Sequence, residues 1–247
     1  MTTDTNARAR GTTTVPGSAE PVPLPPLVQG IALWWCDLAH HPDATEDLGA
    51  CLSPAEHARA ARFGTAELRR RWIAGRATLR RLLGTTLGAT PAEVPIQRGP
   101  RGRPRLADDC LRIDFNVSNT RWVALIGIAC DLPNGARIGV DVEHEERVVG
   151  ADRLALKFLT ARERATLEGQ SADERRRRFL HFWTCKEAMS KATGDGLAAP
   201  FRRLDVELGA PPRLLDGPPP YDPARWALRS PAVPDGYCAT LAVWDGA

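Results

Sequence analysis

The stretch that most constrains this chain is residues 137–143, which read Arg-Ile-Gly-Val-Asp-Val-Glu. β-Branched residues occupy every second position, and this period of two predicts a β-strand. The apolar face suits a core, whereas the other face carries Asp141 and Glu143 beside Gly139. A glycine within a strand leaves room for another part of the structure to come close. Two acids are also common on a solvated strand face, but the apolar opposite face favours an interior strand.

A second stretch, residues 182–191, reads Phe-Trp-Thr-Cys-Lys-Glu-Ala-Met-Ser-Lys and follows a Ser-x-x-Glu capping box at residues 171–174. This pattern predicts a long helix that ends at the glycines 194 and 196. Trp183, Glu187 and Lys191 are spaced i, i+4 and i+8, so they share one stripe of the helix. A surface ion pair between Glu187 and Lys191 is the simpler interpretation, but the aromatic residues upstream indicate a packed helix.

The two stretches together predict a candidate metal site. If the helix crosses the end of the strand, Asp141, Glu143 and Glu187 converge with Lys191. Like charges on one strand face repel each other, and a bound cation removes that penalty. Oxygen-rich clusters of this kind suit a hard divalent cation such as magnesium. Glu187 is then a metal ligand or a general base beside the lysine.

The composition limits the possible function classes. With 247 residues the chain has room for one large domain or two small ones, and its net charge of +3 does not by itself indicate nucleic acid. Arginine clusters at 69–71, 98–105 and 175–178 are more often solvated helix faces than binding sites. The absence of an apolar leader and of a membrane-length run predicts a soluble, cytoplasmic protein.

The cysteines and histidines show no pattern typical of a metal site. No C-x-x-C pair is present, and no cysteine stands at zinc spacing from a histidine, so the thiols are predicted to be free in a reducing compartment. The histidines are interpreted as surface or structural residues. These residues are Cys36, Cys51, Cys110, Cys130, Cys185 and Cys238, and His40, His41, His57, His144 and His181.

The order of helices and strands predicts two related lobes. Residues 1–27 are rich in Thr, Pro and Gly and are predicted to be a disordered tail, followed by an N-terminal lobe at 28–135 and a C-terminal lobe at 136–247. In both lobes helices precede strands. Expected helices are 53–63, 66–83, 151–159 and one that begins after residue 171, and expected strands are 31–35, 111–117, 122–130, 137–143, 204–208, 226–228 and 237–244.

Two features of the chain between these elements are also predicted. The consecutive strands from 111 to 143 predict an antiparallel meander. Glycine and proline make residues 97–105 a basic loop and residues 211–223 a second loop.

Several polar and basic residues are candidates for binding a phosphate. Ser118, Asn119 and Thr120 end a strand and form either a polar turn or an anion site of hydroxyl and backbone N–H groups. Arg103 is as readily a phosphate ligand as a solvated side chain. Lys186 projects about 100° away from the neighbouring glutamate, toward a phosphate or toward solvent. Arginines of the first two helices could line the same cleft: Arg59, Arg62 and Arg71.

Common nucleotide and hydrolase motifs are missing. The sequence contains no Walker-type glycine loop, no G-x-G-x-x-G and no G-x-S-x-G. This weakens assignment of the chain to the usual kinases, dehydrogenases and hydrolases.

The two constraining stretches resemble a known enzyme family. The first motif is Gly-Val-Asp-x-Glu at 139–143, and the second is Trp-x-x-Lys-Glu-Ala-x-x-Lys at 183–191. Glu143 and Glu187 are 44 positions apart (187 minus 143). This pair of motifs resembles the 4′-phosphopantetheinyl transferases of the Sfp type. Further matches are Ser-Pro-Ala-Glu at 53–56, Gly-Arg-Pro at 102–104, Phe-Asn-Val-Ser at 115–118, Arg-Trp at 121–122 and Gly-Tyr at 236–237. The resemblance covers roughly residues 30–245.

This resemblance implies an α+β fold of two similar lobes related by pseudo-twofold symmetry, with the active site in the cleft between them. Members of the family move the 4′-phosphopantetheine arm of coenzyme A onto a serine of an apo carrier protein and release 3′,5′-ADP. The implied enzyme is a holo-[carrier-protein] synthase that serves polyketide or non-ribosomal peptide synthases, and it is monomeric. Its expected partners are coenzyme A and acyl or peptidyl carrier proteins, with no nucleic acid and no membrane.

The resemblance also implies a role for each matching residue. Asp141, Glu143 and Glu187 would hold Mg²⁺, with Mn²⁺ as an alternative, on the pyrophosphate. Glu187 would be the base for the carrier serine, and Lys191 would stabilise the pyrophosphate. The residues expected to bind coenzyme A are Arg59, Arg62, Arg71, Arg103, Ser118, Asn119, Asp141, Lys186 and Lys191.

One position departs from the family pattern. The family usually has a histidine after the serine of the strand, and this histidine meets the 3′-phosphate of coenzyme A. Here the position is Asn119, which donates a hydrogen bond but carries no charge. We expect a weaker 3′-phosphate contact, or compensation by a nearby arginine.

Other functions remain open from the sequence. One is a transferase devoted to fatty-acid carrier proteins. A second is a catalytically silent binding module that keeps the cleft, although the intact acids argue against it. A third is a non-catalytic basic protein that binds nucleic acid, for which aromatic residues interleaved with the basic loop are missing.

Overall fold

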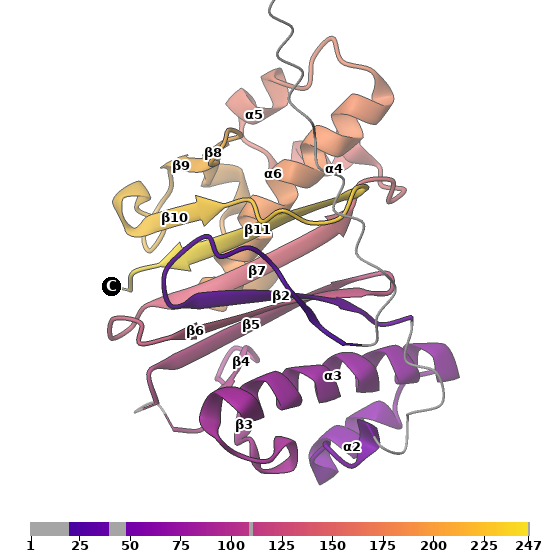
Figure 1. Ribbon diagram of the computed structural model, residues 1–247. Coiled ribbons are helices and arrows are strands. Elements are labelled where there is room, and N and C mark those ends of the chain that lie inside the picture. The colour runs from indigo at the N-terminus through magenta and orange to yellow at the C-terminus, as the bar shows by residue number, and fades with distance from the viewer. Residues whose placement is uncertain (1–19, 40–47, 109–110, 247) are drawn as a thin grey trace, which may run out of the picture.

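A computed structural model describes residues 20–39, 48–108 and 111–246 (Figure 1). Antiparallel sheets form the middle of the molecule, with α2 and α3 on one side and α4 to α6 on the other. The helices are α2 (Pro54–Ala60), α3 (Ala66–Leu87), α4 (Ala151–Phe158), α5 (Ala161–Ala165) and α6 (Ala172–Thr193), with 3₁₀ turns η1 (Pro91–Glu93), η3 (Gly196–Ala198), η4 (Phe201–Arg203) and η5 (Pro223–Arg225). In the part of the chain that the structure describes, no helix is long and apolar enough to cross a membrane.

The strands form two larger sheets and two small hairpins. The larger sheets have the strand orders β1-β2-β6-β5 and β10-β11-β7. The strands are β1 (Val22–Pro23), β2 (Ile31–Asp37), β3 (Ile96–Arg98), β4 (Pro104–Leu106), β5 (Ile113–Thr120), β6 (Val123–Cys130), β7 (Arg137–His144), β8 (Asp205–Glu207), β9 (Arg213–Asp216), β10 (Trp226–Arg229) and β11 (Tyr237–Trp244). The mixed α and β content agrees with the predicted class.

Local capping explains where the helices begin and end. The Ser53 side chain accepts from the Glu56 N–H while Glu56 accepts from the Ser53 N–H, and the same capping box opens α6 at Ser171. Gly194 ends α6 with a φ of 80°, as expected for an αL cap. Helix α3 continues past Gly84 and ends at Gly88, with a φ of 65°, so it is longer than predicted.

Helix α6 lies directly against β7 at Gly139. A Cβ atom at this position would stand 1.9 Å from the carbonyl oxygen of Ala188 and 2.8 Å from the amide nitrogen of Ala192. The close approach that the glycine predicted is therefore confirmed, and the neighbour is the backbone of the long helix. No other residue type fits there without moving α6 off the strand.

Three hydrophobic cores hold the layers together. One lies between α2–α3 and the first larger sheet, and another lies between α4–α6 and the second. The third is shared by the inner faces of both larger sheets, and there Ile138, Val140 and Val142 are at most 1% exposed. The apolar face predicted for residues 137–143 is thus buried against the other sheet.

A seam of polar side chains joins β5 to β7 where no backbone ladder connects the two sheets. Asp114 Oδ2 accepts from the Ile138 N–H at 2.8 Å, and Asn116 Oδ1 accepts from the Val140 N–H at 3.0 Å. Both side chains are buried. They satisfy the edge of β7, whose N–H groups would otherwise be buried without partners.

Several predictions about the topology are wrong. Strands β5 and β6 pair as antiparallel neighbours, but β7 leaves the expected meander and pairs with β11. The basic loop at 97–105 forms the β3–β4 hairpin, and the loop at 211–223 contains β9. Proline at the ends of short edge strands costs no ladder hydrogen bond, which explains why these segments still pair.

The predicted N-terminal tail also extends too far. Within it, β1 pairs with β2, and Leu24 and Leu27 pack against the shared core. Residues 1–19 of that tail lie outside the described residues, as do His40, His41 and Cys110.

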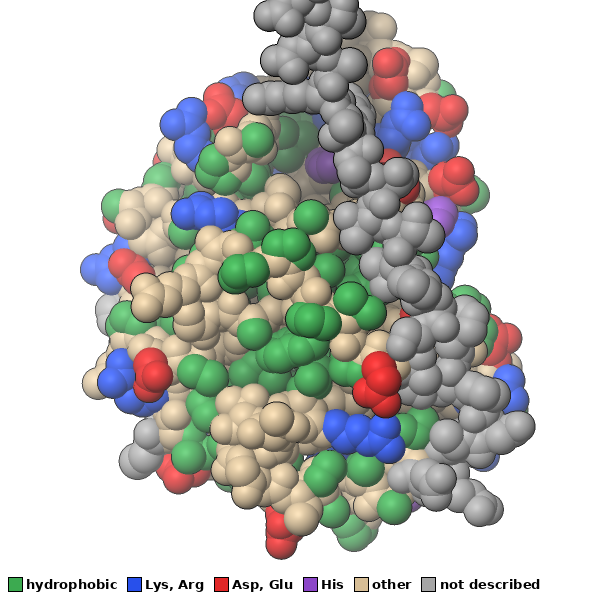
Figure 2. Space-filling view, in the orientation of Figure 1, with side chains coloured by type: hydrophobic (Ala, Val, Ile, Leu, Met, Phe, Trp, Pro, Cys, Tyr) green, Lys and Arg blue, Asp and Glu red, His purple; other side chains and the backbone are tan. Residues whose placement is uncertain are grey.

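The outer surface shows no concentration of one charge on the face seen in Figure 2. Hydrophobic side chains lie over its middle, and positive and negative side chains are interspersed around its edge.

We predict that Gly139→Ala destabilises the protein by more than about 3 kcal/mol, because neither contacting atom is the end of a flexible side chain that could move away. Urea unfolding followed by far-UV circular dichroism measures the change. Gly64→Ala is the matched control, since nothing lies within 4 Å of a Cβ atom there. Equal stabilities of the two variants would show that α6 does not rest on β7 in this way.

Candidate functional site

Lys191 is the residue around which the candidate site is built. Helix α6 carries it to β5 and β7, where its Nζ donates to Asp141 Oδ1 at 2.6 Å and to Ser118 Oγ at 2.8 Å. It also donates to the Val140 carbonyl at 3.2 Å. Ser118 in turn donates to Asp141 at 2.7 Å. One serine, one aspartate and one lysine from three elements therefore form a closed triangle.

The two other predicted acids lie beside this triangle. Glu143 is buried, accepts from Thr120 Oγ1 at 3.1 Å and forms an ion pair with Arg147. Glu187 is half-buried on α6, one turn before Lys191. Serine and threonine of β5 thus each hold one acid of β7.

Two oxygen atoms of this cluster have no partner. Among the described residues, Asp141 Oδ2 and Glu187 Oε1 are buried side-chain oxygens with no hydrogen bond. Buried polar atoms are normally satisfied, and unpaired carboxylate oxygens are especially costly. Two such atoms in an acidic cluster fit a site for a hard cation.

The three acids have not closed around a common centre. Within the described part of the chain, the carboxylate oxygens of Asp141, Glu143 and Glu187 do not all lie within 4.8 Å of one another. Lys191 holds Asp141, and Arg147 holds Glu143 from the exposed side. These two basic side chains compete with any cation for the same carboxylates.

The acids perturb each other's protonation. Burial, followed by repulsion from Asp141, raises the pKa of Glu187 to about 7, and Lys191 only partly opposes this shift. Burial and Asp141 also raise the pKa of Glu143. A carboxyl with a pKa near neutrality is suited to accept and return a proton.

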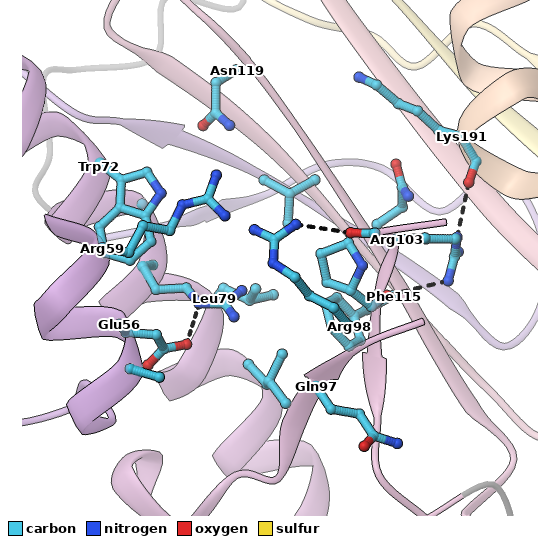
Figure 3. A pocket seen from close by; sticks show the side chains of 18 of the residues that line it. Glu56, Arg59, Trp72, Leu79, Gln97, Arg98, Arg103, Phe115, Asn119 and Lys191 are labelled. Carbon is cyan, nitrogen blue, oxygen red and sulfur yellow. Dashed lines mark hydrogen bonds and ion pairs between the residues drawn. The ribbon is translucent and has the colours of Figure 1, made fainter. Parts of the chain in front are cut away.

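A pocket of about 830 Å³ opens beside the cluster (Figure 3). It lies between α2–α3, the β3–β4 hairpin, β5 and the C-terminal end of α6, and Lys191 belongs to its wall. Six arginines line it against a single acid, Glu56, which is itself paired with Arg76 and Arg80. The six are Arg59, Arg71, Arg76, Arg98, Arg101 and Arg103. The pocket is therefore suited to a polyanion.

Aromatic side chains give part of the pocket a flat wall. Trp72, Phe63 and Phe115 line it, and the Arg59 guanidinium lies 5.7 Å from the centre of the Trp72 ring. Asn119 also lines the pocket, next to Gly75 of α3. Its side chain is exposed. Cationic and aromatic groups together suit a phosphorylated nucleoside.

The structure does not bring every predicted residue to this pocket. Arg59, Arg71, Arg103, Asn119 and Lys191 line it. Ser118 and Asp141 instead form the buried triangle next to it, and Arg62 is exposed outside its lining.

The structure contradicts the expectation that Lys186 binds coenzyme A or lies in solvent. Its side chain is completely buried and donates to Glu163 at 2.6 Å and to the carbonyls of Phe158 and Phe201 at 3.0 and 2.8 Å. All three donors of the ammonium group are therefore used. Lys186 faces the core of the C-terminal half and has no donor left for a phosphate.

Arg103 lines the pocket, but its guanidinium is engaged elsewhere. It forms a bidentate pair with Asp114, at 2.8 Å for both bonds, and donates to the Ile138 and Lys191 carbonyls, each at 2.8 Å. These bonds connect the β3–β4 hairpin to β5, β7 and α6. Its role in binding coenzyme A stays a prediction.

Sequence reasoning missed several residues that shape the site. Thr120 and Arg147 hold Glu143, and Asp114 and Asn116 satisfy the edge of β7. The alternation of polar residues at 114, 116, 118 and 120 was a usable signal, because one face of β5 carries all four. No signal of this kind marked Arg98 and Trp72 as pocket residues.

Comparisons with known proteins agree on one family. Residues 137–242 match the family described as "4′-phosphopantetheinyl transferase superfamily", and residues 41–130 match "4′-phosphopantetheinyl transferase, N-terminal". The chain is 35% identical to the 4′-phosphopantetheinyl transferase HetI of Nostoc sp. over 231 residues, which cover 90% of this chain and 92% of that protein. It is 30% identical to a phosphopantetheinyl transferase of Thraustochytrium sp., over 89% of this chain and 79% of that protein.

We predict that metal-free Glu187→Gln is more stable than the parent protein at pH 8, by roughly 2 kcal/mol after allowance for partial exposure of the side chain. The folded pKa of about 7 lies above the ordinary value of 4.5, so the carboxyl disfavours folding as pH rises from about 4.5 to 7. As the pH falls through that window, the difference should shrink.

Urea unfolding at pH 8 and pH 5 in the presence of a chelator tests this. Glu168→Gln, at an exposed position, is the control and should show no such pH dependence. A Glu187→Gln variant that is less stable than the parent at pH 8 would contradict the prediction.

Proposed function

The chain belongs to the 4′-phosphopantetheinyl transferase superfamily, and we propose that its transfer reaction takes place where α6 crosses β5 and β7. Family membership makes the protein a transferase that moves the phosphopantetheine arm of coenzyme A to a carrier protein. The assignment of the reaction to particular residues rests on one observation. Asp141 Oδ2 and Glu187 Oε1 are buried without partners, beside a lysine that lines the arginine-rich pocket.

Asp141, Glu143 and Glu187 would hold Mg²⁺, with Mn²⁺ as an alternative. The unpaired oxygens and the raised pKa values of Glu143 and Glu187 support this proposal. A bound cation would give the oxygens a partner and would lower both pKa values. When bound, the metal would neutralise charge on the diphosphate of coenzyme A.

The residues of this chain account for the remaining steps. The serine oxygen of the carrier protein forms a bond to the phosphorus of the phosphopantetheine arm, and the bond from that phosphorus to 3′,5′-ADP breaks. Glu187 would accept the serine proton, directly or through water. Lys191 would stabilise the negative charge of the pyrophosphate, and Ser118, which is hydrogen-bonded to both Lys191 and Asp141, would orient the two side chains.

Coenzyme A would occupy the pocket of about 830 Å³. Arg59, Arg71 and Arg98 are available for its phosphates, and Trp72 for its base. Lys191 connects the two regions, since it lines the pocket and contacts Asp141. The reactive diphosphate would therefore lie at the α6 end of the pocket.

We further propose that the two halves are lobes related by pseudo-twofold symmetry, with this site in the cleft between them. Each half packs one 22-residue helix, α3 or α6, against an antiparallel sheet, which supports the proposal. The lobe boundary predicted near residue 135 falls between β6 and β7, which belong to different sheets.

The protein is proposed to act as a cytoplasmic monomer on acyl or peptidyl carrier proteins of polyketide or non-ribosomal peptide synthases. A transferase devoted to fatty-acid carrier proteins is the alternative within the family, and parallel assays with both kinds of carrier distinguish the two. Binding of nucleic acid is disfavoured. The pocket arginines are gathered in a concave site, and Figure 2 shows mixed charges around the edge of one face.

We predict that Glu187→Gln lowers kcat by at least about 100-fold, because the variant loses a proton acceptor and a ligand oxygen. The assay combines magnesium, coenzyme A and an apo carrier protein, and mass spectrometry records the mass gain of the carrier. Glu168→Gln is the control at an exposed position. Near-normal turnover by a folded Glu187→Gln variant would remove Glu187 from both proposed roles.

We predict that Asn119→His lowers the Michaelis constant for coenzyme A, because a charged imidazole would meet the 3′-phosphate better than an amide. Arg71→Ala should raise the same constant by roughly 10- to 100-fold if Arg71 compensates for the missing histidine, since loss of one charge-assisted bond is worth about 1.5–3 kcal/mol. Glu67→Ala, on the same helix but outside the pocket lining, is the control. An unchanged or raised constant in Asn119→His would contradict the idea.

A further inference from the structure

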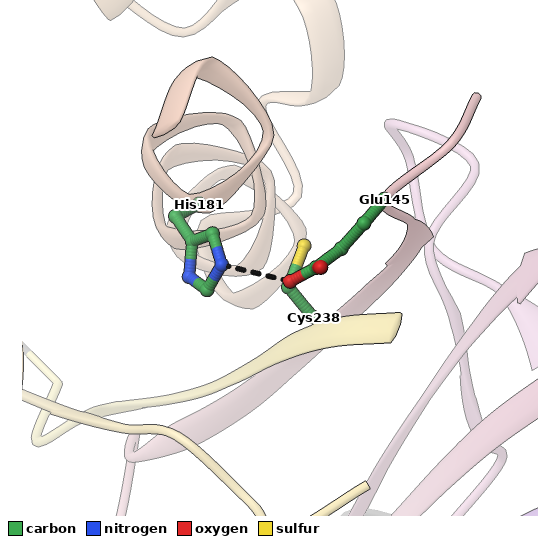
Figure 4. A group of neighbouring side chains, drawn as sticks. All are labelled: Glu145, His181 and Cys238. Carbon is green, nitrogen blue, oxygen red and sulfur yellow. Dashed lines mark hydrogen bonds and ion pairs between the residues drawn. The ribbon is translucent and has the colours of Figure 1, made fainter. Parts of the chain in front are cut away.

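Three side chains with metal-binding chemistry meet outside the acidic cluster (Figure 4). Glu145 follows the end of β7, His181 lies in α6 and Cys238 lies in β11. They come from three separate elements and are 36 and 57 positions apart along the chain (181 minus 145 and 238 minus 181). Their meeting was not visible in the spacing of cysteines and histidines.

The distances between the three side chains fit one small ion. His181 Nε2 lies 3.1 Å from Glu145 Oε1, and one ligand atom from each of the three residues lies within 4.8 Å of the others. Tetrahedral zinc has bonds of about 2.0–2.3 Å, so neighbouring ligand atoms stand about 3.3–3.7 Å apart. Small side-chain rotations close the difference.

The backbone around the group is already fixed. The Glu145 N–H donates to the Gly236 carbonyl at 2.8 Å, and Arg176 Nε donates to the Glu145 carbonyl at 3.1 Å. Cys238 stands opposite Glu143 in the β11–β7 ladder. The glutamate and the cysteine are therefore held by the sheet, and α6 holds the histidine above them.

The three side chains differ in their exposure to solvent. The Cys238 side chain is buried, whereas the side chains of Glu145 and His181 are 25% and 47% exposed. An ion can therefore enter from solvent and keep one coordination position open to water. Burial and the nearby carboxylates of Glu145, Asp141 and Glu143 raise the pKa of the Cys238 thiol, and a cation would reverse that effect.

We propose that Glu145, His181 and Cys238 form a second metal site, which takes a thiophilic divalent cation such as Zn²⁺ with water as the fourth ligand. One thiolate, one imidazole and one carboxylate suit zinc, whereas magnesium prefers oxygen ligands only. The site is thus chemically distinct from Asp141, Glu143 and Glu187. Its metal would connect β7, β11 and α6 at the end of the sheet next to the proposed reaction centre.

Cobalt(II) titration of the full chain tests the site, because a cobalt–thiolate bond has a charge-transfer absorption that oxygen ligands cannot produce. Excess Mg²⁺ in the buffer occupies the oxygen ligands. We expect one equivalent of thiolate-bound cobalt, displaced by Zn²⁺. Cys238→Ser should abolish the absorption, and His181→Asn should weaken cobalt binding by at least about tenfold.

Matched controls separate this site from other thiols and imidazoles. Cys130→Ser and His57→Asn alter residues outside the group and should leave the titration unchanged. Because His181 is exposed, His181→Asn tests the site even if Cys238→Ser fails to fold. Absence of the thiolate absorption in the parent protein, or its persistence in Cys238→Ser, would overturn the proposal.

Discussion

The contact between α6 and β7 at Gly139 is the constraint on which the candidate site depends. A helix normally stands off a sheet by the length of its side chains, but here the Ala188 carbonyl would be 1.9 Å from any Cβ atom at position 139. This close approach brings Lys191 Nζ to 2.6 Å from Asp141 Oδ1. It also places Glu187 close enough to Asp141 for the two carboxylates to repel each other. A larger separation would leave the lysine and the acids in solvent, where their interactions are weak.

Side chains, rather than a backbone ladder, connect the two larger sheets. The polar face of β5 supplies Asp114 and Asn116 to the edge of β7, and Ser118 and Thr120 to its acids. Arg103 reinforces the junction through Asp114 and the carbonyls of Ile138 and Lys191. The same strand therefore joins the halves of the molecule and orients the acids of the candidate site.

The charged side chains of α6 and their partners differ in how deeply they are buried. Lys186 and Glu163 form a completely buried pair that fixes α6 in the C-terminal core, whereas Lys191 lies one to two turns later, at the pocket. Between them, Glu187 is half-buried, and burial raises its pKa to about 7. The acids of this cluster are thus partly desolvated and incompletely paired, and two of their carboxylate oxygens have no hydrogen bond.

The sequence by itself determined the elements whose signals are local. The capping boxes at Ser53 and Ser171, the terminal Gly194 and the alternation in residues 137–143 each involve hydrogen bonds or burial patterns within a few positions. Motif resemblance also singled out Asp141, Glu143, Glu187 and Lys191 as candidates, because the spacing within each motif is visible in the sequence. Only the tertiary structure decided that β7 pairs with β11, that Lys186 turns to Glu163, and that Glu145, His181 and Cys238 meet. Such contacts join distant positions, and they depend on how α6 packs on the sheet rather than on any local pattern.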